Sequence, residues 1–192
     1  MNPWYETVPP ETKLTQGDLV FDCPIIGWKA EPIKFVEGEE LKTLEAAVLA
    51  TRADVVVMTQ ACDLENEKVS DVILCPHLSL DRYKDLWGEE MEARGQTVTP
   101  KNWKAHCDDI RGGFIWNLSI LNENASDEPK MEHRVVDFHY VYTVPRDFLE
   151  SYLKLKNQPR LRIAPPYREH LSQAFARFFM RVGLPIPVSN AW

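Results

Sequence analysis

The chain has 192 residues, of which 44% are apolar and 27% are charged, with 14 prolines against 8 glycines. This composition excludes a disordered or fibrous protein and is typical of one globular domain that buries a core without needing disulfides or a metal. The formal charge of −7 argues against general nucleic-acid binding. No apolar run reaches the roughly 18 residues of a membrane helix, and the N-terminus lacks the basic start and apolar centre of a secretion signal, so we expect a cytoplasmic protein without a membrane partner.

Charge is unevenly distributed along the chain. Residues 151–192 contain seven basic residues and one acidic residue, Glu169, for a net charge of +6, whereas residues 1–150 contain 15 basic and 28 acidic residues, for a net charge of −13. Either the two parts attract each other inside one domain, or the basic part binds an acidic partner. We favour the internal explanation, because charge runs usually compensate one another within a fold.

The first predicted elements lie between residues 1 and 28. Residues 1–15 are polar and proline-rich, which predicts an N-terminal arm lying on the surface. Regular structure is expected to begin at Gly17. A β-prone run over 19–23 predicts a first strand, which residues 25–28 continue or bend.

A helix and a hairpin are predicted next. Residues 39–52 have apolar side chains at helical spacing and acids in the first turn, which predicts an amphipathic helix. The continuous apolar run 55–58 indicates a strand covered on both faces. A second run over 69–76 follows the polar stretch 63–68, and two such runs across a short polar connection predict a β-hairpin.

The middle of the chain alternates between helices and strands. We expect a helix over 80–94 and a second one from Thr99-Pro100 to about Ile110, since threonine followed by proline is a helix-start signal. Residues 114–121 and 134–142 are predicted to form two strands of a second hairpin.

The last two helices complete the predicted fold. One begins at Pro145, and the final one runs from the Pro165-Pro166 pair to Gly183. Apolar residues of the final helix recur at helical spacing and are expected to be buried: Tyr167, Leu171, Phe175, Phe178 and Val182.

The fold class that follows is a single α+β domain over residues 1–192. We expect a small bent antiparallel sheet or SH3-like barrel with helical insertions and a C-terminal capping helix. Residues 17–79 would form the barrel-like core and 80–112 a helical insertion. Residues 113–192 would supply the second hairpin and the C-terminal helices.

The first hairpin carries the most informative polar residues. If its loop is centred near residue 65 or 66, residues whose numbers add to about 131 face each other, which places Arg52 near Ser79 and Asp54 near His77. A guanidinium, an imidazole and a hydroxyl at one end of a sheet can hold a phosphodiester and move a proton. The alternative is ordinary strand-end polarity.

Small and polar residues follow the predicted central strand, where binding sites are often found. Gln60 and Asp63 are therefore candidate binding residues, although an aspartate here can equally form a turn. Zinc held by Cys62, Cys75 and His77 is disfavoured, because the hairpin would separate the two cysteines by roughly 20 Å. The adjacent His106 and Cys107 diverge on a helix, so no metal is expected.

The order of three segments resembles that of the MazF/PemK toxin family. These segments are Gly17-Asp18-Leu19-Val20, then residues 51–59 with Arg52 before the apolar run, then residues 72–79 with Ser79 after the proline. The resemblance implies an SH3-like barrel and metal-independent cleavage of single-stranded RNA by the RNA's own 2′-hydroxyl, without a cofactor. Arg52 and Ser79 match the family's cleavage residues, and we add His77 as a group that could assist proton transfer.

Two functions from different classes follow from the sequence. The first is a toxin-like RNA-binding protein or endoribonuclease acting on single-stranded RNA. The second is a non-catalytic interaction subunit of a bacterial multi-gene system, binding a protein from the same gene cluster or forming a homodimer. In the second case the basic residues Arg177 and Arg181 and the aromatic residues Trp4 and Trp192 are the expected contacts.

Overall fold

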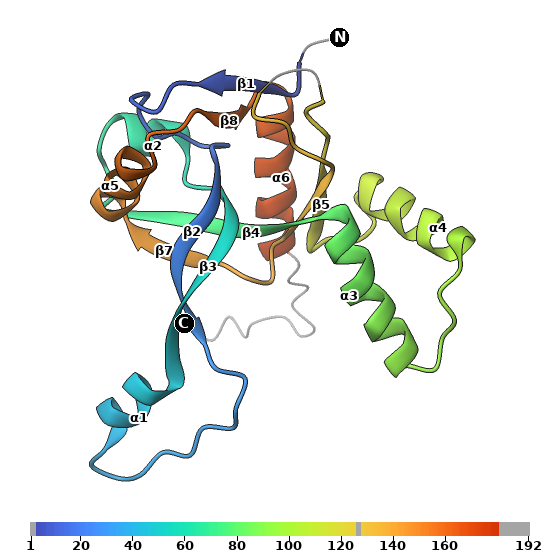
Figure 1. Ribbon diagram of the computed structural model, residues 1–192, viewed down its shortest axis with the longest axis horizontal. Coiled ribbons are helices and arrows are strands. Elements are labelled where there is room, and N and C mark those ends of the chain that lie inside the picture. The colour runs from blue at the N-terminus through green and yellow to red at the C-terminus, as the bar shows by residue number, and fades with distance from the viewer. Residues whose placement is uncertain (1–2, 126–127, 181–192) are drawn as a thin grey trace, which may run out of the picture.

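The structure is a computed structural model that describes residues 3–125 and 128–180. Within these residues the chain forms an α+β fold in which six helices surround antiparallel strands (Figure 1). The predicted α+β class is confirmed. The sequence predicted either a bent sheet or a small barrel, and the described strands form a sheet that does not close into a barrel.

The strands pair in two groups. The larger sheet has the order β2-β3-β4-β6-β5, with β7 also paired to β4, and the smaller one joins β1 to β8. The strands are β1 (Tyr5–Val8), β2 (Leu19–Trp28), β3 (Val48–Val57), β4 (Asp71–Ser79), β5 (Leu118–Leu121), β6 (Arg134–Asp137), β7 (Tyr142–Pro145) and β8 (Arg160–Ile163).

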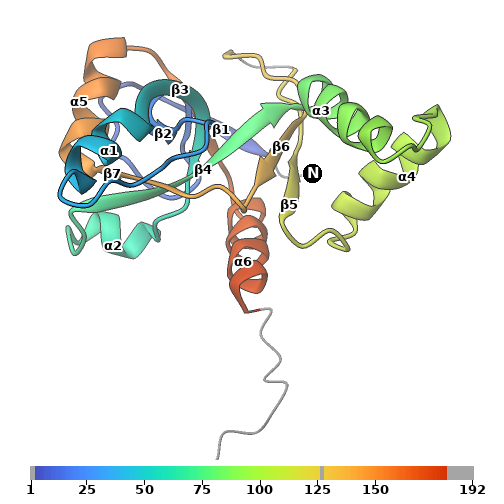
Figure 2. The ribbon, with the colours of Figure 1, turned by 90° about the horizontal axis from the view of Figure 1, so that it is seen from below.

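The helices are α1 (Glu40–Ala47), α2 (Ala61–Glu65), α3 (Leu80–Ala93), α4 (Pro100–Arg111), α5 (Arg146–Lys156) and α6 (Tyr167–Phe179). Helices α3 and α4 stand to one side of the sheet as a helical hairpin, which is the predicted insertion (Figure 2). Thr99 and Asn102 form a capping box at the start of α4, as the Thr-Pro signal predicted. Val182 and Gly183, which were predicted to belong to the final helix, lie outside the described residues.

Strand β3 is the centre of the core. Val55, Val56 and Val57 are fully buried, and alternate side chains enter two different apolar clusters. Val56 belongs to the cluster that includes Leu171 of α6, whereas Val55 and Val57 belong to the cluster that includes Leu149 of α5. The predicted strand covered on both faces is confirmed, and α5 and α6 supply parts of the two covers.

The predicted helix over 39–52 is too long. Helix α1 ends at Ala47, and Val48 to Arg52 belong to β3 because they pair with β2, from Trp28↔Val48 to Pro24↔Arg52. The cross-strand pairing overrides the helical spacing of the apolar residues, which is a weak preference on its own.

The N-terminal segment is more regular than predicted. Its residues Tyr5–Val8 form β1, which pairs with β8, and neither strand was expected. Tyr5 and Val8 are buried, and the Trp4 ring stacks on Tyr167 with 3.9 Å between ring centroids. Trp4 is thus held within the fold, so it is not the exposed partner contact that the sequence suggested.

The second predicted hairpin is present with shorter strands. β5 and β6 pair from Leu118↔Asp137 to Leu121↔Arg134, and the run 134–142 breaks after Asp137. The break occurs at Phe138, which is fully buried and donates its main-chain N–H to the Asn117 carbonyl at 2.8 Å. A buried aromatic side chain at a turn therefore separates β6 from β7.

The opposite charges of the two parts of the chain meet inside the domain. Asp18 is fully buried and its carboxylate accepts hydrogen bonds from Arg160 and Arg162 of β8, with Arg160 Nε at 2.8 Å. Lys156 pairs with Asp22 at 3.1 Å. The internal explanation for the uneven charge is confirmed for these three basic residues.

We expect Asp18→Asn to lower the free energy of unfolding by about 3–5 kcal/mol, because the change leaves two guanidinium groups without their carboxylate in a buried site. Urea unfolding followed by circular dichroism measures this loss. Glu39→Gln is the matched control, since it removes one charge from the exposed Glu39–Lys42 pair and is expected to cost less than about 1 kcal/mol. Equal losses in the two variants would contradict the importance of the buried cluster.

Candidate functional site

The first hairpin has the predicted register. β3 and β4 are antiparallel with Val55 facing Pro76, Val56 facing Cys75 and Val57 facing Leu74. The predicted polar connection contains the short helix α2 in place of a simple loop. The geometry on which the candidate site depended is therefore confirmed up to the Val55–Pro76 pair.

The two strands separate immediately beyond that pair. His77, Leu78 and Ser79 of β4 pair with β6, while the preceding half of β3 stays with β2. A recess of about 280 Å³ lies where the strands part. It is lined by Asp22, Arg52, Ala53, Asp54, Pro76, His77 and Leu78.

Arg134 of β6 fills the space between Asp54 and His77. Its Nε donates to His77 Nδ1 at 2.6 Å, and its Nη2 donates to the Asp54 carboxylate. The Arg134 guanidinium carbon also lies 5.2 Å from the centroid of the Phe21 ring. Sequence analysis placed Asp54 near His77 but missed Arg134, since only the pairing of β4 with β6 brings it here.

His77 is held as a neutral imidazole. It is fully buried, and burial together with the positive charge of Arg134 sets its pKa well below the ordinary value. Because Nδ1 accepts from Arg134, the proton of the neutral ring is on Nε2. Burial also lowers the pKa of Arg134, and the carboxylate of Asp54 opposes that shift.

Arg52 stands at the exposed rim of the recess. Its side chain is 59% exposed, and Nη1 pairs with Asp22 Oδ2 at 2.6 Å. A hydrogen bond from Lys156, with the charge of Arg52, lowers the pKa of Asp22. Arg52 can therefore meet an external anion, but it must exchange its Asp22 contact to do so.

Ser79 caps helix α3 and does not line the recess. Its Oγ accepts the main-chain N–H of Arg82 at 3.1 Å, which caps α3, and Ser79 is absent from the lining of the recess. Arg52 and His77 thus share one recess, whereas the hydroxyl serves the start of a helix. The predicted trio does not assemble in this structure.

The predicted binding residues lie elsewhere. Gln60 precedes α2 and Asp63 lies within it. Both follow the C-terminal end of β3, whereas Arg52 lies in the middle of that strand. Arg177 is on α6 with its guanidinium carbon 5.9 Å from the Trp116 ring centroid. Arg181 and Trp192 are outside the described residues.

The cysteines form no cluster with other ligands. Cys62 is exposed beside Asp63, whereas Cys75 is buried in the core, where burial raises its pKa to about 12. Across residues 3–125 and 128–180, no three histidine, cysteine or acidic side chains are arranged to hold a metal ion.

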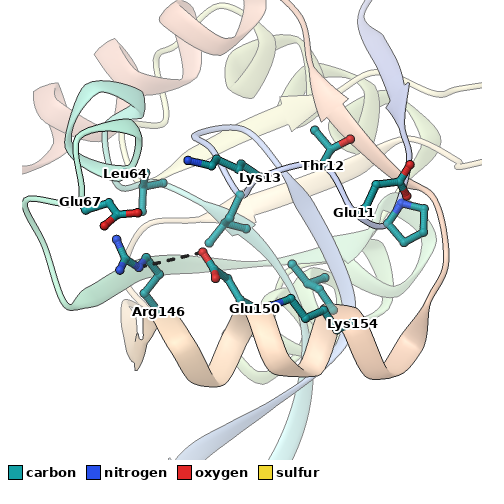
Figure 3. Close-up of a pocket in the computed structure, with 11 residues that line it drawn as sticks. Glu11, Thr12, Lys13, Leu64, Glu67, Arg146, Glu150 and Lys154 are labelled. Carbon is teal, nitrogen blue, oxygen red and sulfur yellow. Dashed lines mark ion pairs between the residues drawn. The ribbon is translucent and has the colours of Figure 1, made fainter.

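A second recess, of about 270 Å³, lies between the N-terminal segment, α2 and α5 (Figure 3). Its charged lining residues are three acids and three bases, so the recess has no net charge that would select an anion or a cation. Arg146 and Glu150 face each other within it, with 4.0 Å between Nε and Oε1 (Figure 3). We assign it no chemistry.

The largest unexplained feature is a projection formed by residues 23–54. Figure 1 shows β2 and β3 continuing beyond the body as a twisted pair that ends in α1. Large apolar side chains are exposed along it: Ile26, Trp28, Ile33, Phe35, Val36, Leu41, Leu44 and Leu49. Only Ala47 is buried in α1, so the amphipathic helix has no core to cover.

Arg52 and the apolar residues of β2 lie on one face of the projection. Pro24, Ile26 and Trp28 alternate along β2, and Pro24 is the cross-strand partner of Arg52. The exposed fractions of Ile26 and Trp28 are 71% and 67%. Arg52, at the rim of the recess, therefore lies on the same face as Ile26 and Trp28.

Comparison with protein-family models and with curated protein sequences finds no match for this chain. Among the described helices, none combines the length and the apolar character that crossing a membrane requires. The function is therefore argued from the geometry of the recess and of the projection.

The buried neutral His77 makes stability depend on pH. Between pH 7.5 and 5 the unfolded chain protonates this imidazole with an ordinary pKa of about 6.5, whereas the folded chain does not, so the free energy of unfolding falls as the pH falls. His77→Gln removes this contribution. We expect the difference in unfolding free energy between wild type and variant to shrink by about 2 kcal/mol between pH 7.5 and 5.

Urea unfolding at the two pH values measures the effect, and the exposed His170→Gln variant is the control that should follow the wild type. A constant difference between the wild type and His77→Gln would show that His77 takes up its proton as readily in the folded chain as in the unfolded chain, and would contradict the buried neutral imidazole.

Proposed function

We propose that this chain is a non-catalytic protein-interaction subunit that binds its partner through the projection. The observation that carries the proposal is the set of eight large apolar side chains exposed on residues 26–49. Large exposed apolar side chains concentrated on one segment in this way are uncommon on monomers and common at interfaces. Trp28 and Phe35 provide the aromatic side chains that often contribute most of the binding free energy.

The contacts made by the predicted catalytic residues also favour a non-catalytic function. His77 is buried and neutral, Ser79 caps a helix, and Arg52 is paired with Asp22. A general base must reach the proton that it removes. The accepting nitrogen of His77, Nδ1, already accepts a hydrogen bond from Arg134. The predicted catalytic groups are therefore engaged in structural contacts.

We expect the double variant Trp28→Lys/Phe35→Lys to lose association with its protein partner, because the change places two charges in the apolar surface. Co-expression with the products of adjacent genes, followed by size-exclusion chromatography, measures association with those products and with a second copy of the chain. Leu155→Lys is the matched control, since Leu155 is an exposed apolar residue of α5, outside the projection.

Loss in the double variant with retention in the control is the expected result. Association of the double variant at wild-type strength would contradict the proposal. So would a wild-type chain that binds none of these proteins, itself included.

A second candidate function is binding and cleavage of single-stranded RNA at the recess. It is favoured by Arg52 and His77 lining one recess and by the exposure of Arg52, the residue that the resemblance to the toxin family assigns to cleavage together with Ser79. An incoming phosphodiester would replace Asp22 as the partner of the guanidinium.

For this candidate we expect cleavage of single-stranded RNA that persists in the presence of a chelator and falls at least tenfold in Arg52→Ala, because the guanidinium would stabilise charge on the reacting phosphate. Gel analysis of the RNA measures it. Arg94→Ala, which removes an exposed arginine paired with Glu90 on α3, should cleave like the wild type. Intact RNA with the wild-type protein would eliminate the candidate.

A further inference from the structure

The projection is expected to be only marginally stable in water when nothing covers it. Between Trp28↔Val48 and Pro24↔Arg52 it is a two-stranded ribbon, since β4 pairs with β3 only at Val55–Val57. Two-stranded hairpins and helices of eight residues are both marginal in isolation. Such a segment gains stability when another chain covers it.

The projection also contains a recess that can receive a side chain. A recess of about 360 Å³ lies between α1 and the segment that leads to it, with Ile33, Ala46 and Ala47 among its lining residues. Three lysines and two glutamates complete its charged lining, so its rim presents both signs. The same projection exposes two aromatic side chains, Trp28 and Phe35, at 67% and 66%.

Because the aromatic anchors and the recess both belong to the projection, two projections can bind each other. We infer that the partner of the projection is a second copy of this chain, with two projections related by a two-fold axis and an aromatic side chain of each copy seated in the recess of the other. This inference rests on the proposed function. A two-fold interface needs one surface only, and every contact in it occurs twice.

The exposed apolar area is close to what such a dimer needs. At roughly 150–250 Å² for a large side chain, the exposed residues other than Leu49, which faces the opposite side of the ribbon from Ile26 and Trp28, present on the order of 700 Å². A standard interface takes about 800 Å² from each partner. The mixed charges at the rim suit a second copy, because lysines of one copy can meet glutamates of the other, whereas a strongly basic or acidic partner would meet like charges.

The test combines anchor and recess variants. Trp28→Ser/Phe35→Ser removes both anchors, and Ala46→Trp fills the recess without removing apolar surface. Sedimentation equilibrium between about 1 and 100 µM should give twice the 22.2 kDa chain mass for the wild type and for the Leu155→Lys control. Each of the two test variants should raise the dimer dissociation constant by about 30-fold or more.

Mixing provides a second readout. An anchor-free copy retains a recess and a recess-filled copy retains anchors, so their mixture should recover part of the dimer that neither forms alone. Circular dichroism confirms that each variant is folded.

A wild-type chain that stays monomeric at 100 µM overturns the inference, as does a dimer that both variants leave intact. If the monomeric wild type instead binds a different protein through Trp28 and Phe35, the inference fails and the proposed function stands.

Discussion

Strand β4 pairs with β3 only as far as Pro76, whereas His77–Ser79 pair with β6 on the other edge of β4, and both the recess and the projection depend on this arrangement. The recess between Asp54 and His77 opens where the β3–β4 pairing ends. Arg134 enters with β6 and satisfies both groups, since its guanidinium donates to the carboxylate and to the imidazole. An unpaired charge at this depth would cost several kcal/mol, so Arg134, His77 and Asp54 are best regarded as one unit.

The first half of β3 lies beyond the end of the β3–β4 pairing. It has only β2 as its neighbour, and the two strands leave the body as the projection (Figure 1). The core therefore ends where the apolar strip of Ile26 and Trp28 begins. Exposed strand edges beside apolar side chains are a hazard for aggregation unless another chain covers them, which connects the fold directly to the proposed interaction.

The sequence predicted what local patterns determine. The α3 and α4 helices, the hairpin register at Val55–Pro76 and the doubly covered strand β3 all follow from spacing, caps and apolar runs. Arg134 and Asp18 could not be predicted, because their partners are 57 and 142 residues away in the chain. The long predicted helix over 39–52 was wrong for a related reason: pairing with β2 is a non-local interaction that outweighs helical periodicity.

The central claim is that the projection is a folded surface covered by another chain. Amide hydrogen exchange at residues 25–28 and 48–50 tests it most directly, comparing the wild-type assembly with Trp28→Lys under the same conditions. The account predicts slow exchange in the wild type and fast exchange in the variant, with the amides of β5 unchanged. Equally fast exchange at the projection in both proteins would contradict it.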